Sequence, residues 1–226
     1  MADQEEIVLT GGRVTAGVVR VADTVRRPLG SHSPFVHQLL KHLESRRVSC
    51  VPRFLGIDAR GREILTYIAG TVPSDLGEFS DAQLSAAARI LRNLHDGTVD
   101  CDLRDGCEIV CHGDPSPCNY VFSNEVPIAI IDFDAARPGL RREDVGYAAW
   151  MWLDIGEEDA SPRELARRLR LFAEAYGAVS SQDIVPSILA VQDELATRPD
   201  VPVRVRTWAG QCRNWLEHHR AAIRSG

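Results

Sequence analysis

The sequence lacks several features that would have assigned it to a class at once. No apolar run approaches the roughly 18 residues that a membrane-spanning helix requires. The six cysteines include no C-x-x-C pair, which argues against a zinc site or a disulfide scaffold, so we expect all six to be reduced and mostly buried. The charge of −6 argues against a basic nucleic-acid-binding face. We therefore expect neither nucleic acid nor a membrane as a partner.

The N-terminus also lacks a targeting signal. Its first ten residues, MADQEEIVLT, are acidic and contain no basic segment followed by an apolar one, so we expect a cytoplasmic protein. The chain has 226 residues, 44% hydrophobic and 26% charged, which suits one globular unit or two small lobes sharing an interface. Nothing in the sequence indicates the oligomeric state.

The first 70 residues combine short strand-like runs with one helix. A glycine-bearing turn, GGRVTAG, separates the first two runs, and a helix follows with Ser33 as its N-cap and Pro34 at its first position. The strands are expected at 7–10, 18–21, 25–27, 54–57 and 63–68.

From about Gly70 the pattern becomes mainly helical. Ser80 and Gln83 form a capping box ahead of an amphipathic helix, and strand-like runs follow at 109–111, 120–123 and 128–133. Three helices are expected at the end: one starts at Ser161, one spans 183–196 and one spans 203–223. The outline is α+β, with a small β-rich lobe at 1–69, a hinge near 66–70 and a helical lobe at 70–226.

Two polar segments interrupt this pattern. CHGDPSPCNYVF at 111–122 places Asp114 five residues before Asn119, and IAIIDFDAARPG at 128–139 places Asp132 at the end of an apolar strand. The two strand ends could converge and bring two carboxylates and one amide together. Phosphoryl transfer requires this inventory: a carboxylate that orients the attacking hydroxyl, and oxygen ligands for Mg²⁺.

The motif H-G-D-x-x-x-x-N followed by I-D-F-D resembles the aminoglycoside phosphotransferase and choline kinase group of the protein-kinase-like superfamily. The resemblance implies a two-lobed kinase-like fold, with Asp114 as catalytic base and with Asn119 and Asp132 as Mg²⁺ ligands. It also implies supporting roles for three further residues, His112 in the catalytic loop, Asp134, and Asp144 as a brace of that loop.

The resemblance extends over about residues 7–153 and includes a nucleotide site for ATP or GTP. The segment ILTYIAG at 64–70 resembles the hinge whose main chain binds adenine, which implicates Thr66 and Ile68. Residues 10–17 occupy the place of the phosphate-covering turn, which implicates Gly11 and Gly12. For GGRVTAG alone an ordinary hairpin turn is the default interpretation, and only the position of this segment before the catalytic segments favours the phosphate-covering turn.

The phosphate-binding cation departs from the kinase template. That template places a lysine on the third strand and pairs it with a glutamate on the following helix. Here the third strand contains VRRP, so Arg26, or alternatively Arg27, takes the place of the lysine. The glutamate position holds Val36, with His37 beside it, so the ion pair is absent or replaced.

The acceptor expected from the resemblance is a small cationic molecule with a hydroxyl group, such as an aminoglycoside. An acidic stretch at Asp154, Glu157, Glu158 and Asp159 could face a polycationic substrate, or could be a solvated connecting loop. Two alternatives remain open. One is a metabolic kinase for an amino alcohol or a sugar, and the other is a catalytically silent kinase-like module that binds a nucleotide or a partner.

Overall fold

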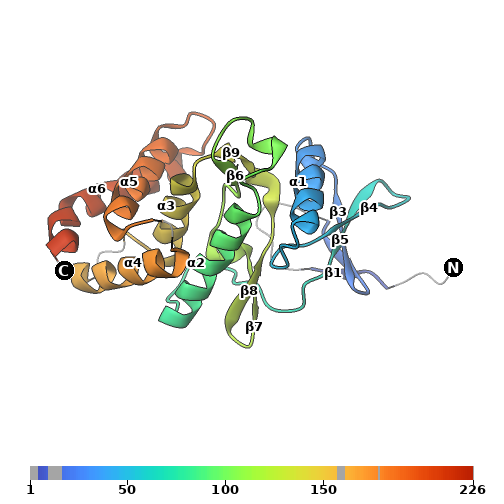
Figure 1. Cartoon of the computed structure of the whole chain (residues 1–226), viewed down its shortest axis with the longest axis horizontal. Helices are drawn as coiled ribbons and strands as arrows, with labels where there is room; N and C mark the ends of the chain where they lie inside the picture. The colour runs from blue at the N-terminus through green and yellow to red at the C-terminus, as the bar shows by residue number, and fades with distance from the viewer. Residues whose placement is uncertain (1–4, 10–16, 157–160, 178, 226) are drawn as a thin grey trace.

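A computed structural model describes residues 5–9, 17–156, 161–177 and 179–225 of the chain. A five-stranded sheet with one helix forms one end of the molecule, helices α4 to α6 form the other end, and the polar segments lie between them (Figure 1). This arrangement confirms the predicted α+β class.

The sheet at the N-terminal end is antiparallel, with the order β1-β2-β3-β5-β4. Helix α1 (Ser33–Ser45) covers it and buries Val36, Leu39, Leu40 and Leu43 at helical spacing. Ser33 is the first residue of the helix, and the N-cap is His32 rather than Ser33. The Ser33 hydroxyl accepts the N–H of Gly30, which precedes the helix, at 2.9 Å. The strands are β1 Ile7–Val8, β2 Val19–Val21, β3 Thr24–Pro28, β4 Phe54–Ile57 and β5 Arg62–Thr66.

The chain leaves this sheet through a segment that passes close to a later hairpin. Thr71 and Phe122 exchange two main-chain hydrogen bonds of 2.9 and 2.7 Å. Gly70 has φ +157°, and a Cβ atom there would lie 2.3 Å from the carbonyl oxygen of Phe122. Only glycine allows the two main chains to approach this closely.

Helix α2 (Asp81–Asp96) packs against α3, α4, β6 and β8, whereas α5 and α6 pack on α3, on α4 and on each other. The N-terminus of α2 carries the predicted capping box between Ser80 and Gln83. Two small antiparallel ladders, β6 with β9 and β7 with β8, lie beside it. The other elements are β6 Ile109–Cys111, β7 Tyr120–Ser123, β8 Val126–Ile130, β9 Arg137–Gly139, α3 Arg141–Trp152, α4 Pro162–Tyr176, α5 Ser181–Thr197 and α6 Val203–Ser225, with short 3₁₀ turns at Asp102–Arg104, Pro117–Asn119 and Phe133–Ala135.

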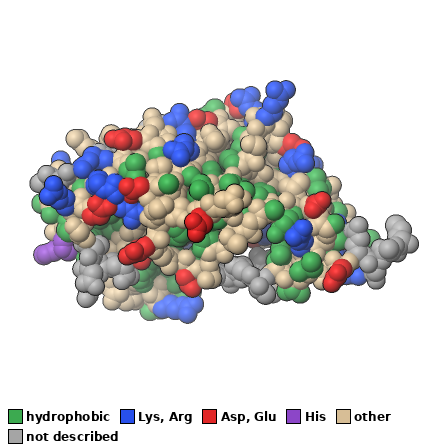
Figure 2. Space-filling view, turned by 90° about the horizontal axis from the view of Figure 1, so that it is seen from below, with side chains coloured by type: hydrophobic (Ala, Val, Ile, Leu, Met, Phe, Trp, Pro, Cys, Tyr) green, Lys and Arg blue, Asp and Glu red, His purple; other side chains and the backbone are tan. Residues whose placement is uncertain are grey.

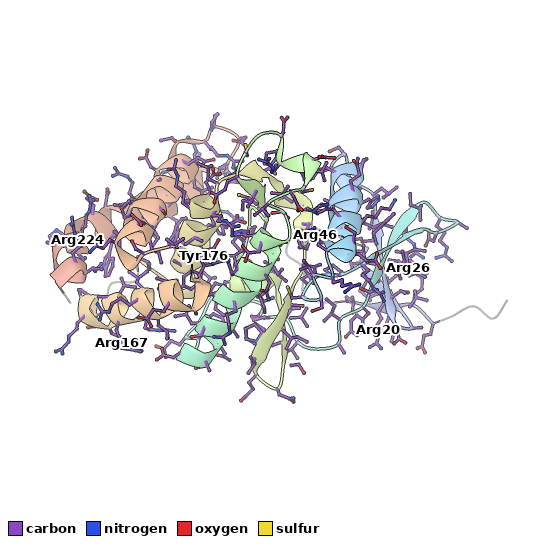
Figure 3. The ribbon with its side chains drawn as sticks, in the orientation of Figure 1. Arg20, Arg26, Arg46, Arg167, Tyr176 and Arg224 are labelled. Atoms are coloured by element: carbon purple, nitrogen blue, oxygen red, sulfur yellow. The ribbon has the colours of Figure 1, made fainter. Side chains whose placement is uncertain are left out.

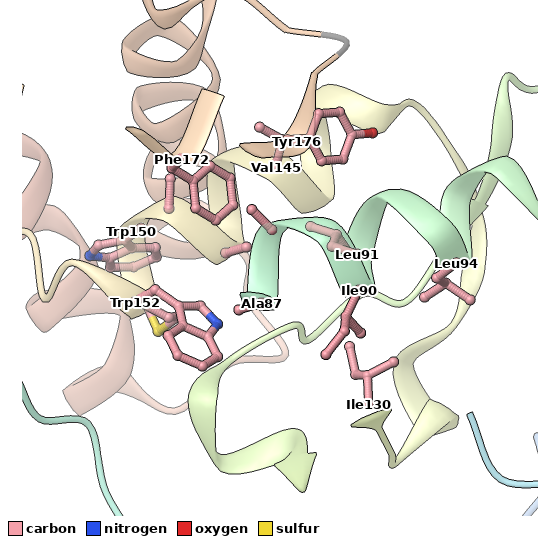
Figure 4. Packing of buried hydrophobic residues seen from close by; sticks show 14 of the residues in the cluster. Ala87, Ile90, Leu91, Leu94, Ile130, Val145, Trp150, Trp152, Phe172 and Tyr176 are labelled. Atoms are coloured by element: carbon pink, nitrogen blue, oxygen red, sulfur yellow. The ribbon is translucent and has the colours of Figure 1, made fainter. Parts of the chain in front are cut away.

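One apolar core joins these elements. Leu91 and Leu94 of α2, Val145 of α3 and Phe172 of α4 are buried members of one cluster, and Figure 4 shows Leu91 on the side of α2 that faces Val145. The six cysteines are free, and four of them are buried. None of the described helices is long and apolar enough to cross a membrane. On the face seen in Figure 2, basic and acidic side chains are interspersed at the helical end.

Candidate active site

The segment between β6 and β7 is held by a buried histidine. His112 is fully buried, and its Nε2 lies 3.0 Å from the carbonyl oxygen of Ile131. Its Nδ1 accepts the Asp114 main-chain N–H at 3.3 Å. Burial lowers the pKa of His112 more than the nearby carboxylates raise it, so the ring is neutral near pH 7. A neutral ring with Nε2 as donor and Nδ1 as acceptor satisfies both contacts.

A second buried group, the carboxylate of Asp144 on α3, holds the same segment. It accepts the main-chain N–H groups of His112 at 2.6 Å and Gly113 at 2.9 Å, and it lies 2.9 Å from His95 Nε2. Burial alone would raise the pKa of Asp144, but the contact with His95 and these N–H groups hold it below the ordinary value. A charged carboxylate therefore fixes the main chain beside Asp114.

Gly113 brings this loop against the second polar segment. Its φ is +86°, and an added Cβ would lie 2.1 Å from the carbonyl oxygen of Ala135. Ile131 also donates its N–H to the carbonyl oxygen of Asn119 at 2.8 Å. The two motifs that stand apart in sequence are therefore in main-chain contact.

The two segments bring Asp114, Asn119 and Asp132 into one region. The Asn119 amide group donates to the main-chain carbonyl of Asp114 at 2.8 Å, which leaves its side-chain oxygen for another partner. Asp132 has a left-handed conformation, with φ 66° and ψ 73°, at the end of an apolar strand. Asp114 Oδ1 is buried and has no hydrogen-bond partner among the described residues. A buried acceptor without a partner is what an absent substrate hydroxyl would satisfy.

These donors fit a magnesium ion bound together with phosphates. The described part of the chain contains no group of three or more His, Cys, Asp or Glu side chains able to hold a metal by themselves. Mg²⁺ usually binds one or two carboxylates and takes its other ligands from water and phosphate. The Asp132 carboxylate and the Asn119 amide oxygen are the hard oxygen donors that such a site requires.

The contacts of β3 place Arg27, not Arg26, at this site. Arg27 NH1 lies 3.4 Å from Asp132 Oδ1, and its NH2 is hydrogen-bonded to Asp134. Adjacent residues of a strand point to opposite faces, and Arg26 contacts Thr24 and lies 3.8 Å from Asp58 (Figure 3). Burial lowers the pKa of Arg27, but Asp134, Glu63 and Asp132 more than offset this, so its pKa is raised.

No lysine could take this role. Lys41, on the exposed side of α1, is the single lysine of the sequence, and its ammonium group lies 5.3 Å from the centre of the Phe54 ring. Val36, at the predicted glutamate position, is buried in the core.

Sequence reasoning missed Glu63 on β5. It is 2% exposed, and its carboxylate lies 2.9 Å from Arg27 Nε and 2.6 Å from His37 Nε2. The signal that could have revealed it is the strand register, because Arg27 and Glu63 are directly opposite on β3 and β5.

The structure describes only some of the other residues that were predicted to bind the nucleotide or the substrate. Thr66 ends β5, and its hydroxyl accepts the Arg53 N–H at 2.9 Å. Ile68 lies two residues beyond that strand. Five of the predicted site residues lie outside the described part of the chain: Gly11, Gly12, Glu157, Glu158 and Asp159.

A cavity of about 260 Å³ opens between α3 and α5 on the Asp114 side of the loop. Tyr147, in its wall, has a pKa well above the ordinary value because of burial, the nearby Asp114 charge and a hydrogen bond with the Asp114 side chain. Asp154 is not in the wall and lies seven residues beyond Tyr147 along the chain. The wall consists of Gly113, Ala135, Arg137, Glu143, Asp144, Tyr147, Val191, Glu194, Leu195 and Arg198.

Comparison with known proteins confirms the resemblance that the motifs indicated. Residues 100–181, which include both polar segments, match the model of the phosphotransferase enzyme family. The ADP-bound aminoglycoside phosphotransferase APH(2'')-Ib has a TM-score of 0.58 at 14% identity over 95% of this chain and 94% of that chain. Spectinomycin phosphotransferase APH(9)-Ia, in complex with ADP and spectinomycin, has a TM-score of 0.56 at 12% identity over 97% and 92%. These likenesses show the kinase-like fold.

A curated relative covers almost the whole chain. The trifolitoxin immunity protein of Rhizobium leguminosarum bv. trifolii is 28% identical over 256 aligned residues, covering 97% of each chain.

Proposed function

We propose that this chain, which carries the phosphotransferase family segment on an aminoglycoside-phosphotransferase-like fold, transfers the γ-phosphoryl group of ATP or GTP to a hydroxyl of a small molecule. The observation that carries the proposal is that hydrogen bonds link the two polar segments. The Asn119 side-chain amide donates to the Asp114 carbonyl oxygen, and the N–H of Ile131, next to Asp132, donates to the Asn119 carbonyl oxygen. Asp144 fixes the loop that carries Asp114. Phosphoryl transfer depends mainly on such positioning and on charge stabilisation.

In this mechanism the acceptor hydroxyl donates its hydrogen bond to the partnerless Oδ1 of Asp114. The hydroxyl oxygen forms a bond to the γ-phosphorus while the bond from that phosphorus to the β-phosphate oxygen breaks, leaving a nucleoside diphosphate. Asp114 receives the hydroxyl proton as the new bond forms. The Asp144 brace keeps the loop from shifting during this exchange.

The charged groups that would bind the nucleotide phosphates come from both halves of the molecule. Asp132 and Asn119 would hold Mg²⁺, which would supply positive charge to offset that of the phosphates. Arg27 extends from β3 to the same carboxylate segment, 3.4 Å from Asp132. Its guanidinium can form two parallel hydrogen bonds to phosphate oxygens.

The acceptor would occupy the cavity between α3 and α5. Tyr147 and Gly113 in its wall flank Asp114. Glu143 and Glu194 can receive an amine, although Arg137 lies 2.5 Å from Glu143. The cavity volume of about 260 Å³ is below the roughly 300–1,000 Å³ of sites for drug-sized ligands. This size favours a compact acceptor, such as an amino alcohol or a single sugar ring, or one ring of a larger aminoglycoside.

A second candidate function rests on the full-length likeness to the trifolitoxin immunity protein. In this case the chain protects a cell from a toxic compound, either by phosphorylating it or by binding it without turnover. The binding form corresponds to a silent kinase-like module. Asp114 separates the two forms, because only the enzyme requires a base beside the acceptor hydroxyl.

A phosphotransfer assay tests the proposal. The protein is incubated with Mg-ATP or Mg-GTP and a panel of amino alcohols, sugars and aminoglycosides, and the products are measured by mass. We expect wild type, and not Asp114→Asn, to form a product about 80 Da heavier than its acceptor. This difference is the HPO₃ unit that phosphoryl transfer adds. Nucleotide binding without any product over a broad panel would favour the binding form.

A further inference from the structure

We infer that Glu63 and His37 are positioning residues for Arg27, so that the neighbouring strand supplies the acid that orients the phosphate-binding cation. This inference rests on the proposed function, since it assigns Arg27 to nucleotide phosphates. It concerns two residues that neither the motif nor the family segment at 100–181 includes.

The first argument is the geometry of the three side chains. The Glu63 carboxylate has one oxygen 2.9 Å from Arg27 Nε, an ion pair without hydrogen-bond geometry, and the other oxygen 2.6 Å from His37 Nε2. With Glu63 beside Nε, the two terminal nitrogens of Arg27 extend to Asp132 and Asp134. Glu63 therefore contacts the end of the guanidinium that faces away from the proposed metal ligands.

The second argument is the depth of the carboxylate. The Glu63 side chain is 3% exposed, and those of Arg27 and His37 are each 12% exposed. Removing an ion pair from water costs several kcal/mol per ion, and apolar residues of similar size are often at least as stabilising. Stability alone therefore gives little reason to place this pair inside the lobe, whereas fixing a cation in one direction does.

The third argument is the position of His37. Its ring stacks on Phe54 with 3.7 Å between ring centres and an angle of 16° between planes. A stacked ring has little rotational freedom, so its Nε2 fixes one oxygen of Glu63. Near the start of the same helix, His32 Nε2 lies 2.7 Å from the carbonyl oxygen of Ala136, beside the metal segment. Helix α1 thus contacts both Glu63 and the segment that contains Asp132.

A double-mutant cycle on nucleotide affinity tests the inference. The affinity for Mg-ATP and Mg-GTP is measured by calorimetry for wild type, Arg27→Gln, Glu63→Gln and the double variant. Loss of a charge-assisted interaction should weaken binding by about 10- to 100-fold in Arg27→Gln. We expect Glu63→Gln to weaken it about tenfold, and the double variant to bind no worse than Arg27→Gln, because Glu63 acts through Arg27.

Two further variants are measured in the same way: His37→Gln as a second test of the inference and Arg26→Gln as a control. His37 contacts Glu63 and reaches Arg27 only through it, so we expect a loss of about threefold, smaller than that of Glu63→Gln. Arg26 is on the opposite face of β3, and its replacement should leave the affinity unchanged. Unfolding by urea is followed for every variant.

Three outcomes would overturn the inference. One is additive losses in Arg27→Gln and Glu63→Gln, and another is a Glu63→Gln variant that loses stability but binds nucleotide like wild type. If Glu63→Gln does not fold, an unchanged affinity in His37→Gln overturns it. A wild-type protein that binds neither nucleotide overturns the proposed function itself, which separates the two failures.

Discussion

Asp114 and Arg27 approach the site from opposite halves of the molecule, and different interactions hold them. The loop of Asp114 is fixed through its main chain, by N–H groups donated to Asp144 at 2.6 and 2.9 Å. Arg27 is fixed through side chains alone, by its ion pairs with Glu63 and with the carboxylates beyond it. The position of the loop therefore depends on one acceptor, the Asp144 carboxylate, whereas the position of Arg27 depends on the register between β3 and β5.

The balance of charge also differs between the loop of Asp114 and the surroundings of Arg27. At the loop, one buried carboxylate meets main-chain donors and a histidine. Around Arg27, one positive charge faces the three carboxylates of Glu63, Asp132 and Asp134. This leaves an excess of negative charge beside the proposed metal ligands. Such an excess attracts a divalent cation, and it would repel nucleotide phosphates when the cation is absent.

Replacing Asp114 should have the largest effect. In Asp114→Asn the acceptor for the hydroxyl proton is lost, so turnover should fall by about 10²- to 10⁴-fold. Nucleotide affinity should match that of wild type, because Asp114 is not among the proposed metal ligands. Asparagine keeps a side-chain oxygen for the contact with Tyr147, so urea unfolding should change little. Initial rates with Mg-ATP and Mg-GTP measure the change. An unchanged rate would remove Asp114 from the mechanism.

Replacing Asp144 should have the next largest effect, on stability. Asp144→Asn removes a buried charge from its partners, and breaking a buried pair costs about 3–5 kcal/mol. The lowered pKa of Asp144 means that its contribution is present above the unfolded-state pKa of about 3.9. The contribution is lost as the pH falls through the still lower folded-state value.

Urea unfolding at several pH values checks this second prediction. The difference between wild type and Asp144→Asn should be constant near neutral pH and should shrink below about pH 4. Asp23→Asn is the matched control, because the Asp23 side chain is fully exposed. A pH-independent difference between wild type and Asp144→Asn would contradict the assignment of a charged carboxylate.

Asp132→Ala tests the metal ligand against its neighbour Asp134. We expect the variant to lose the Mg²⁺-dependent part of nucleotide binding, because Asp132 supplies the only carboxylate among the proposed ligands. Asp134→Ala is the control with the same charge change, and it should keep most of the Mg²⁺ dependence. Titrations of nucleotide with and without Mg²⁺ measure both. Equal wild-type affinities with and without Mg²⁺ would exclude the metal assignment.

The sequence predicted the loop side better than the cation side for a physical reason. Strands β6 and β7, the capping box of α2 and the order of Asp114, Asn119 and Asp132 follow from local sequence pattern, which can be read without knowing the fold. The partner of Arg27 depends on which strand pairs with β3 and in which register. A one-residue change of register would place Glu63 on the other face, so the sequence could not identify it.

Helix α1 and the acceptor cavity illustrate the same limit. Val36, which the resemblance assigned to the glutamate position of the template, is buried because it belongs to the apolar stripe of the helix. The cavity wall combines three separate stretches, near 113, from 135 to 147 and from 191 to 198. The acidic stretch beginning at Asp154 was a candidate substrate-binding segment because of its run of charge, yet Asp154 is not part of the cavity wall.

The smallest expected effect concerns the hinge, where main chain and side chain can be separated. Thr66→Val removes the hydroxyl that accepts the Arg53 N–H at 2.9 Å, which should cost about 0.5–1 kcal/mol of stability. If the hinge binds the base through its main chain, nucleotide affinity should remain at the wild-type value, whereas Arg27→Gln weakens it strongly. Calorimetry on both variants makes the comparison. A large loss of affinity in Thr66→Val would mean that a side chain, and not the main chain, recognises the base.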